Sequence, residues 1–316
     1  MGEAPAEQIG RRRFPETSLS FSTLSISIDP PAVAPPSADA RTVALLRRAR
    51  ERGVTTFDIA EARFPVRAER LLATAFPEAD PELFSLIGRS VESLAAERGS
   101  SDDPGAGRSM TEIVRSSLER SSRRLAPVRI GVVDWDAGAH GTPENSDRPV
   151  MPPPTPESAP EVIEWATRLS PNATALPTAR ALFSGTFSLL EEGPAPLFDS
   201  AVPSAMASLI ARNPFADGRL DGTRFASTVA LGGPREGPVD LRHLHTEFDP
   251  ILRLGFLTEG RRRTLAQAAL HYVLRWPWVV TCVIPLPAPE RFDEILGYGM
   301  APPLSDDELE RLGRVK

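Results

Sequence analysis

The chain has 316 residues, 41% of them hydrophobic and 25% charged, which suffices for a large buried core and excludes a disulfide-stapled mini-protein. Its net charge of −6 argues against nucleic acid or an anionic membrane as the main partner, because both bind basic surfaces. The only lysine is Lys316, so no internal lysine is present for Schiff-base, pyridoxal-phosphate or P-loop chemistry.

The first half of the chain alternates strand-like and helix-like stretches, the pattern of βα units that build a parallel sheet. Apolar runs predict the strands, and apolar residues at helical spacing predict the helices. Gly53 supplies a stop for the first helix. The expected strands are Ser22–Ile28, Thr55–Asp58, Leu83–Arg89 and Ile130–Trp135, and the expected helices are Ala38–Arg52, Ala68–Ala75 and Met110–Leu125.

The second half continues the alternation after a Pro-rich loop over residues 141–157. Ser305 is expected to cap the last helix, with Glu308 at the capping-box position. The expected helices are Glu161–Leu169, Leu265–Arg275, Pro289–Gly297 and Ser305–Leu312, and the expected strands are Phe183–Leu190, Ser208–Ala211 and Val279–Ile284.

Eight βα units in about 300 residues predict an α/β fold, a (β/α)8 TIM barrel, with a doubly wound open sheet as the alternative. We expect one domain over residues 1–316, with the barrel at about 18–300 and a C-terminal helix at about 304–314. The single cysteine, Cys282, excludes an intrachain disulfide and is expected to be a buried thiol. No signal peptide follows Arg11–Arg13 and no apolar run reaches about 18 residues, so we expect a cytoplasmic protein without a membrane partner.

Five motifs follow one another along the chain: GVTTFDIAE at 53–61 with AERLL at 68–72, SLERSSRRL at 117–125, LIARNPFADGRL at 209–220, TLAQAAL at 264–270 leading to VIP at 283–285, and LSDDEL at 304–309. In order and content they resemble motifs of the aldo/keto reductase family. The resemblance spans nearly the whole chain. It implies a TIM barrel and identifies the sequence as similar to a divergent member of that family.

The resemblance also implies where a catalytic tetrad of Asp, Tyr, Lys and His would stand. Asp58 occupies the position of the aspartate. The tyrosine position falls on Arg63 or Phe64, the lysine position on Arg89, and the histidine position near Asp136. Only the aspartate of the tetrad is therefore retained, and a guanidinium, which stays protonated, cannot replace the missing proton-transfer groups.

Further residues are candidates for substrate or metal binding. Trp135 is either a stacking wall for a substrate or a core aromatic. Phe64 and His140 are further substrate-binding candidates. His243 and His245, with Glu247 and Asp249, form a loose cluster without the helical spacing of zinc enzymes, so we expect no metal.

The family resemblance implies an NADPH site, and the residues at its positions are mixed. Phe187 stands where an aromatic side chain would stack on nicotinamide, and Asn213, Pro214 and Ala216 stand in the loop that would contact the pyrophosphate. Arg262 is a candidate for the adenosine 2′-phosphate. Against this, Pro287 and Pro289 lack amide hydrogens in the segment that would bind phosphate. Two alternatives therefore remain open: the protein binds NADPH, or it binds no cofactor.

Three functions remain open from the sequence, each with a small-molecule ligand. The first is non-redox acid/base chemistry, such as dehydration, cyclisation or isomerisation of a small, anionic or neutral, biosynthetic intermediate. In it Asp58 and Asp136 would transfer protons, and Arg63 and Arg89 would hold the anion. The second is an atypical NADPH-dependent carbonyl oxidoreductase. The third is a non-catalytic pseudoenzyme that binds or scaffolds, in which Asp58 and Arg89 form a structural ion pair. The sequence does not specify the oligomeric state.

Overall fold

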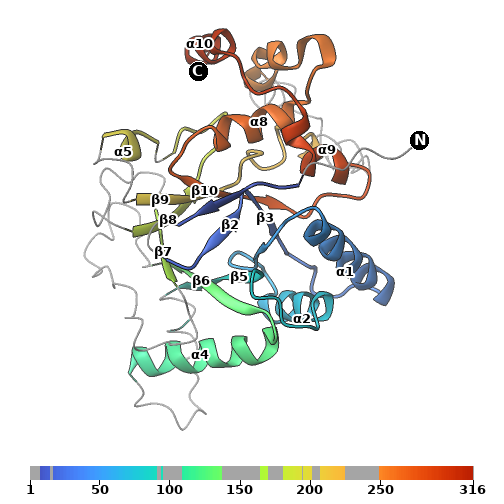
Figure 1. Cartoon of the computed structure of the whole chain (residues 1–316), viewed down its shortest axis with the longest axis vertical. Helices are drawn as coiled ribbons and strands as arrows, with labels where there is room; N and C mark the ends of the chain where they lie inside the picture. The colour runs from blue at the N-terminus through green and yellow to red at the C-terminus, as the bar shows by residue number, and fades with distance from the viewer. Residues whose placement is uncertain are drawn as a thin grey trace, which may run out of the picture.

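The computed structural model describes residues 8–14, 17–90, 94, 109–136, 164–169, 181–193, 195–200, 207–224 and 249–315. Eight parallel strands close into a barrel in the order β10, β3, β4, β5, β6, β7, β8, β9 (Figure 1). Their bounds are β3 Leu24–Ser27, β4 Thr56–Asp58, β5 Phe84–Ser90, β6 Arg129–Asp136, β7 Glu164–Arg168, β8 Ala181–Thr186, β9 Ala207–Arg212 and β10 Val279–Pro285. The expected TIM barrel is confirmed.

Helices surround the strands, with α1 and α2 on one side, α4 below, and α8 and α9 above in the view of Figure 1. Their bounds are α1 Pro36–Glu51, α2 Pro65–Ala75, α4 Met110–Leu125, α5 Ala195–Ser200, α8 Leu265–Leu274, α9 Phe292–Leu296 and α10 Asp306–Val315, with short 3-10 helices η3 Gly255–Arg261 and η4 Tyr298–Met300. No helix in the described ranges is long and apolar enough to cross a membrane.

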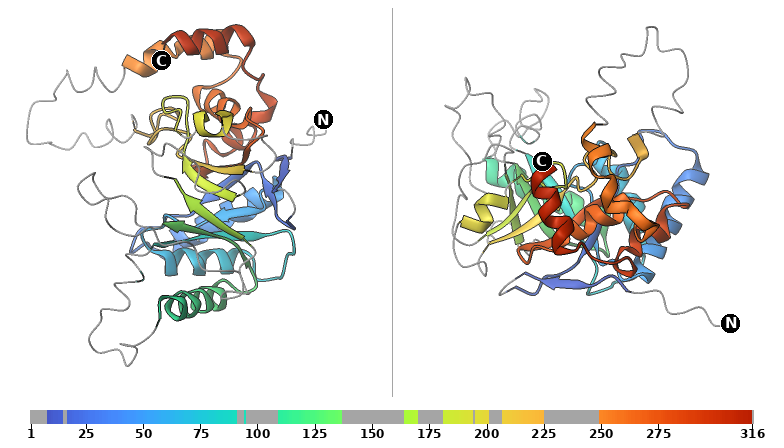
Figure 2. Two further views of the ribbon diagram at one scale, coloured as in Figure 1. Left: turned by 90° about the vertical axis from the view of Figure 1, so that its left-hand side faces the viewer. Right: turned by 90° about the horizontal axis from the view of Figure 1, so that it is seen from above.

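A short hairpin closes the end of the barrel where the strands begin. It consists of β1 Arg11–Arg13 and β2 Ser20–Ser22, which pair antiparallel just before β3 (Figure 2, right). Phe14, Leu19 and Phe21 of this hairpin are buried with the interior residues of the barrel, and Phe21 meets Phe84 edge to face at 5.2 Å. The interior is therefore packed at this end, as in other barrels of this size.

Side chains alternate along each strand between the inside of the barrel and the layer between barrel and helices, so the protein has two hydrophobic cores. Leu86, Val132 and Ile210 point into the barrel, whereas Ile87 and Val133 belong to the larger core between barrel and helices. A polar residue two positions after an interior residue therefore points to the inside of the barrel mouth, the end formed by the C-terminal ends of the strands. This parity decides which predicted site residues meet.

Most expected elements are confirmed to within a few residues, including α4 and the Ser305–Glu308 capping box at the start of α10. Gly53 ends α1 with a φ of +95°. The expected helix Glu161–Leu169 is wrong, because residues 164–168 form strand β7. The error arises because a short apolar stretch satisfies helical and strand spacing equally well, and only pairing with β6 and β8 decides between them. The Pro-rich loop 141–157 lies outside the described residues.

Candidate functional site

Arg212 spans the mouth of the barrel. It is the last residue of β9, and its guanidinium reaches Asp58 at the end of β4. Nη1 donates to Oδ2 of Asp58 at 3.1 Å and Nη2 donates to Oδ1 at 3.0 Å, a bidentate pair. Both side chains are buried, with 4% of the Arg212 side chain and none of the Asp58 side chain exposed. The mouth is thus occupied by a protein ion pair.

Asp134 extends this pair into a network. Its Oδ2 lies 2.8 Å from Nη2 of Arg212 and accepts a hydrogen bond from Nη2 of Arg168 at 2.6 Å. The Ser184 hydroxyl donates to Oδ1 of Asp134 at 2.7 Å. Glu61, half of whose side chain is exposed, lies 3.2 Å from Arg168 and 3.8 Å from Arg212. We call these six residues the mouth network: Asp58, Glu61, Asp134, Arg168, Ser184 and Arg212.

Mutual stabilisation keeps Asp134 and Arg212 ionised in the mouth network. Burial alone would raise the pKa of Asp134, but Arg212 and Arg168 lower it below its ordinary value. Burial would likewise lower the pKa of Arg212, but Asp58 and Asp134 raise it above its ordinary value. A carboxylate held charged by two guanidiniums is a poor proton donor at neutral pH and a weakened base.

A cleft of about 480 Å³ opens beside the mouth network, between the C-terminal ends of β5 and β6 and helices α2 and α4. Asp136, at the end of β6, lines it and shares strand parity with Asp134. The ionisable residues that line the cleft are four arginines and three carboxylic acids: Arg89, Arg120, Arg124, Arg168, Glu69, Asp134 and Asp136. The lining therefore carries one more positive than negative charge. Buried Glu69 forms an ion pair with Arg124 inside it.

The predicted ion pair between Asp58 and Arg89 is wrong, because Asp58 pairs with Arg212. Gly88 lies two residues after the interior residue Leu86 and so faces the inside of the barrel. The side chain of the next residue, Arg89, therefore points outward to α4. There Nη2 donates to the Ser121 hydroxyl at 2.6 Å, while Nη1 donates to the Gly88 carbonyl at 2.6 Å. Gly88 itself admits no side chain, since a Cβ would lie 2.1 Å from the Ala60 carbonyl oxygen. Strand β5 thus offers no cation to the inside of the mouth.

Two predicted aromatic contacts to ligands fall in the outer core instead. Trp135 is fully buried and meets Trp165 edge to face at 5.9 Å, so the core-aromatic alternative holds. Phe187 is also fully buried, with Trp278 at 5.3 Å and Tyr272 at 5.9 Å between ring centroids. Its ring is covered by these aromatic neighbours rather than exposed to a nicotinamide.

Arg63 and Phe64 lie away from the mouth network. The Arg63 backbone amide and Nε donate to the two carboxylate oxygens of Asp29, at 3.0 and 2.9 Å. Phe64 is partly exposed and directly precedes α2. Both residues line a groove between α1 and α2 on the outside of the barrel. The structure therefore does not bring Arg63 together with Asp58.

The hydrogen-bond donors of the loop after β9 bind acceptors within the same loop. The Ala216 amide donates to the Asn213 carbonyl at 3.0 Å, and Asn213 exchanges two hydrogen bonds with Asp217. Pro214 has no amide hydrogen. The Ala216 amide predicted to face a pyrophosphate is therefore committed to this turn.

Arg262 is exposed and lines a separate cleft of about 590 Å³ between η3 and the start of α10, together with Asp307 and Glu308. Its role toward a 2′-phosphate stays a prediction. His140, His243, His245 and Glu247 lie outside the described residues, so their predicted roles have no structural counterpart here.

Sequence reasoning missed Arg212, Asp134, Arg168 and Ser184. The motif LIARNPFADGRL contained Arg212 without marking it, because the family pattern places no requirement there. Strand parity was the available signal, since Arg212 lies two positions after interior Ile210 and Asp134 two after interior Val132. Arg168 was missed because residues 161–169 were predicted to form a helix, whereas Arg168 ends strand β7.

Several solved structures similar to this one over nearly the whole chain are aldo-keto reductases. The holo form of aldo-keto reductase AKR11C1 from Bacillus halodurans superposes with a TM-score of 0.63 at 16% identity, covering 98% of this chain and 96% of that chain. The thermostable aldo-keto reductase Tm1743, in complex with the inhibitor epalrestat, gives 0.63 at 15% identity, covering 97% and 99%. The glycerol dehydrogenase AKR11B4 from Gluconobacter oxydans gives 0.61 at 15% identity, covering 96% and 94%.

At this identity the likeness shows the aldo-keto reductase barrel fold, and fold alone does not carry an activity. No protein-family model matches the sequence, and no curated protein matches it.

Proposed function

We propose that this protein binds a small organic anion in the cleft beside the mouth network and acts on it by proton transfer rather than hydride transfer. The observation that carries the proposal is the bridge from Arg212 to Asp58 and Asp134, which occupies the centre of the mouth with protein charges. Among the described residues, the Asp58 side chain is fully buried behind Arg212 and does not line the adjacent cleft, which leaves that cleft as the space for a ligand.

The positions of the two tyrosines also favour chemistry without reduction. Tyr272 lies on α8 and packs against Phe187 in the outer core. The Tyr298 hydroxyl lies 3.2 Å from that of Thr23, just before β3, at the end of the barrel opposite the mouth. Neither phenol is placed to donate a proton at the mouth, which is what a Tyr-dependent carbonyl reduction needs.

The cleft supplies groups for recognition and for proton transfer. Arg120 and Arg168 line it and would hold a carboxylate or phosphate through charge-assisted hydrogen bonds. Asp136 lines the same cleft and is our candidate for the proton-transfer residue. Asp58 and Asp134 are assigned to positioning, because their oxygens already accept hydrogen bonds from Arg212, Arg168 and Ser184.

Calorimetric titrations with inorganic phosphate, citrate and 2-oxoglutarate test binding, and parallel titrations with NADPH and NADP⁺ test the reductase alternative. We expect Arg120→Gln to weaken the binding of an anion about tenfold, the size of one charge-assisted hydrogen bond. Arg123→Gln is the matched control, because Arg123 is exposed on the same helix and does not line the cleft. Saturable binding of NADPH at micromolar concentration would overturn the proposal in favour of a reductase.

Deuterium exchange at carbon 3 of 2-oxoglutarate, followed by proton NMR, tests proton transfer. We expect the wild type to accelerate exchange and Asp136→Asn to lose the acceleration while still binding the anion. The filled mouth also favours a second candidate, a non-catalytic binding protein. Binding by the wild type without any exchange would select that candidate.

A further inference from the structure

A groove of about 1010 Å³ runs between α1 and α2 on the outside of the barrel, and it shares only Pro65 and Val66 with the cleft of the proposed function. Its floor is apolar, formed by Val43 of α1 and Leu71 of α2, and the exposed Ala44 also lines it. Val43 and Leu71 are buried. The groove has a hydrophobic base between two helices of 16 and 11 residues.

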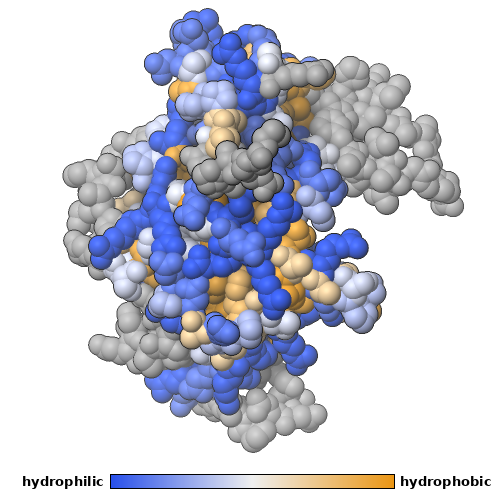
Figure 3. Space-filling model, turned by 45° about the vertical axis from the view of Figure 1, so that its right-hand side comes forward, coloured by the Kyte–Doolittle hydropathy of each residue, from blue (hydrophilic) through white to orange (hydrophobic). Residues whose placement is uncertain are grey.

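Apolar side chains also line the open side of this groove. Phe64 is 40% exposed and Val66 is 42% exposed, two of the few large hydrophobic residues exposed among the described residues. Figure 3 brings this side of the molecule forward and shows apolar surface at mid-height, bordered by hydrophilic residues. A contiguous apolar surface with a polar border is typical of an interaction site.

The border of the groove is strongly basic although the whole chain is acidic. Its ionisable lining residues are four arginines and one aspartate: Arg47, Arg63, Arg67, Arg70 and Asp39. With Asp29, which pairs with Arg63 at this border, the groove carries a net charge of +2 in a chain of −6. Charge complementarity selects an acidic ligand.

We propose that the α1/α2 groove docks an acidic amphipathic helix of a partner protein. Such a helix places apolar residues at i, i+3, i+4 and i+7 on Val43, Leu71, Phe64 and Val66, with carboxylates beside the arginine border. The groove is a surface channel rather than an enclosed cavity. An acyl chain in it would stay half in water, whereas an amphipathic helix turns its polar side outward.

The arginines differ in how readily they meet a carboxylate. Arg67 pairs with Asp39, and Arg63 with Asp29. Arg70 is exposed on α2, and within the described part of the chain its guanidinium has no ion pair or hydrogen bond. Arg70 therefore gains a partner on docking without breaking an existing contact, which makes it the most informative position to change.

The test uses the full chain and a fluorescein-labelled synthetic 14-residue helix with leucines at i, i+3, i+4, i+7 and i+11 and glutamates on the other face. We expect saturable binding by fluorescence anisotropy. Arg70→Glu is expected to weaken binding at least tenfold, and Val66→Asp by a similar factor. The control variant Arg123→Glu, an exposed arginine on α4 away from the groove, is expected to leave the affinity within twofold.

Two further probes separate other occupants from the proposed one. A scrambled peptide of the same composition, without an apolar face, is expected not to bind. Equal binding of both peptides, or equal affinity of wild type and Arg70→Glu, would overturn the proposal. Binding of phosphatidylglycerol vesicles that Arg70→Glu abolishes, without peptide binding, would assign the groove to a membrane instead. Sedimentation velocity showing a dimer that Val66→Asp dissociates would assign it to a second copy of the chain.

Discussion

Arg212 is the residue on which the barrel mouth depends, since one guanidinium contacts two buried carboxylates from β4 and β6. Each of these carboxylates is costly to bury alone, and the shared guanidinium offsets that cost. Arginine suits the position because its planar fork binds Asp58 through two nitrogens while Nη2 also reaches Asp134. Lysine would offer a single point charge.

Replacing Arg212 with methionine is expected to destabilise the protein by about 3–5 kcal/mol, because it leaves Asp58 buried without its partner. Urea unfolding followed by circular dichroism measures the change. Arg212→Lys keeps a charge and is expected to lose less. The exposed control Arg123→Met is expected to stay within about 0.5 kcal/mol of wild type. Equal stability of Arg212→Met and wild type would contradict the structural role given to the mouth network.

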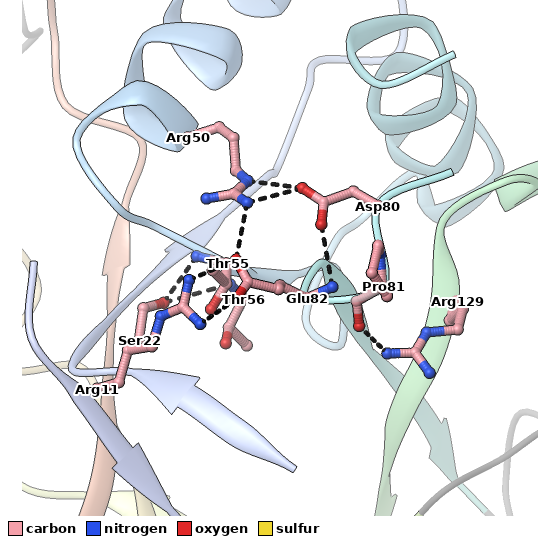
Figure 4. A network of polar contacts seen from close by, with 9 residues as sticks. All are labelled: Arg11, Ser22, Arg50, Thr55, Thr56, Asp80, Pro81, Glu82 and Arg129. Carbon is pink, nitrogen blue, oxygen red and sulfur yellow. Dashed lines mark hydrogen bonds and ion pairs between the residues drawn. The ribbon is translucent and has the colours of Figure 1, made fainter. Parts of the chain in front are cut away.

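At the scale of elements, the N-terminal hairpin is held to the barrel by charges as well as by its buried aromatic residues. Arg11 of β1 binds Glu82 through two hydrogen bonds of 2.7 Å, and Arg50 of α1 contacts both Asp80 and Glu82 (Figure 4). The Ser22 hydroxyl accepts hydrogen bonds from the amides of Thr55 and Thr56. Three segments distant in sequence are thereby joined at the end of the barrel opposite the mouth.

The Arg11–Glu82 contact predicts a defined acid sensitivity. Its hydrogen bonds lower the pKa of Glu82 from 4.5 to about 2. Because the folded pKa lies below the unfolded one, the stabilisation is fully present above about pH 4.5 and is lost as the pH falls toward 2. Glu82→Gln should therefore lower the urea midpoint at pH 6 by an amount that shrinks below pH 4.5.

Glu119→Gln is the control for this experiment, since Glu119 is an exposed residue on α4 whose carboxylate lies 3.9 Å from Arg123. It should change the midpoint little at any pH. A deficit of Glu82→Gln that stayed constant from pH 6 to pH 2.5 would show that the ion pair is not its origin. Added salt should reduce the deficit at pH 6, because the pair is solvent-exposed.

At the scale of the whole molecule, each of the eight barrel strands is paired on both sides, so we expect the barrel to unfold as one unit. Cys282 lies in the centre of β10, is fully buried as the sequence predicted, and its pKa is raised by burial. Its thiolate is therefore absent and inaccessible in the native state. A single buried thiol reports when the closed barrel opens.

We expect the thiol reagent DTNB to leave the native protein unlabelled for hours and to label Cys282 in parallel with the loss of circular dichroism in urea. Absorbance at the wavelength of the released thiolate measures the reaction. Cys282→Ala supplies the baseline. Rapid labelling of the native protein in buffer would mean that β10 separates from β3 or β9 without global unfolding.

The sequence by itself predicted the barrel, through the alternation of elements and the family resemblance, together with most of its strands and helices and the burial of Cys282. Apolar periodicity and helix caps are local signals, so they can be read without the fold, whereas the hairpin strand β1 and helix α5 were not predicted. The sequence also excluded chemistry that needs an internal lysine, because the only lysine is Lys316. The tertiary structure alone decided which side chains meet: it paired Asp58 with Arg212 rather than Arg89, turned Trp135 and Phe187 outward, and made residues 164–168 a strand. Contacts across a barrel join residues more than a hundred positions apart. A shift of one residue along a strand moves a side chain from the inside of the barrel to the outside. The position of a residue within a motif therefore could not show which side chains meet.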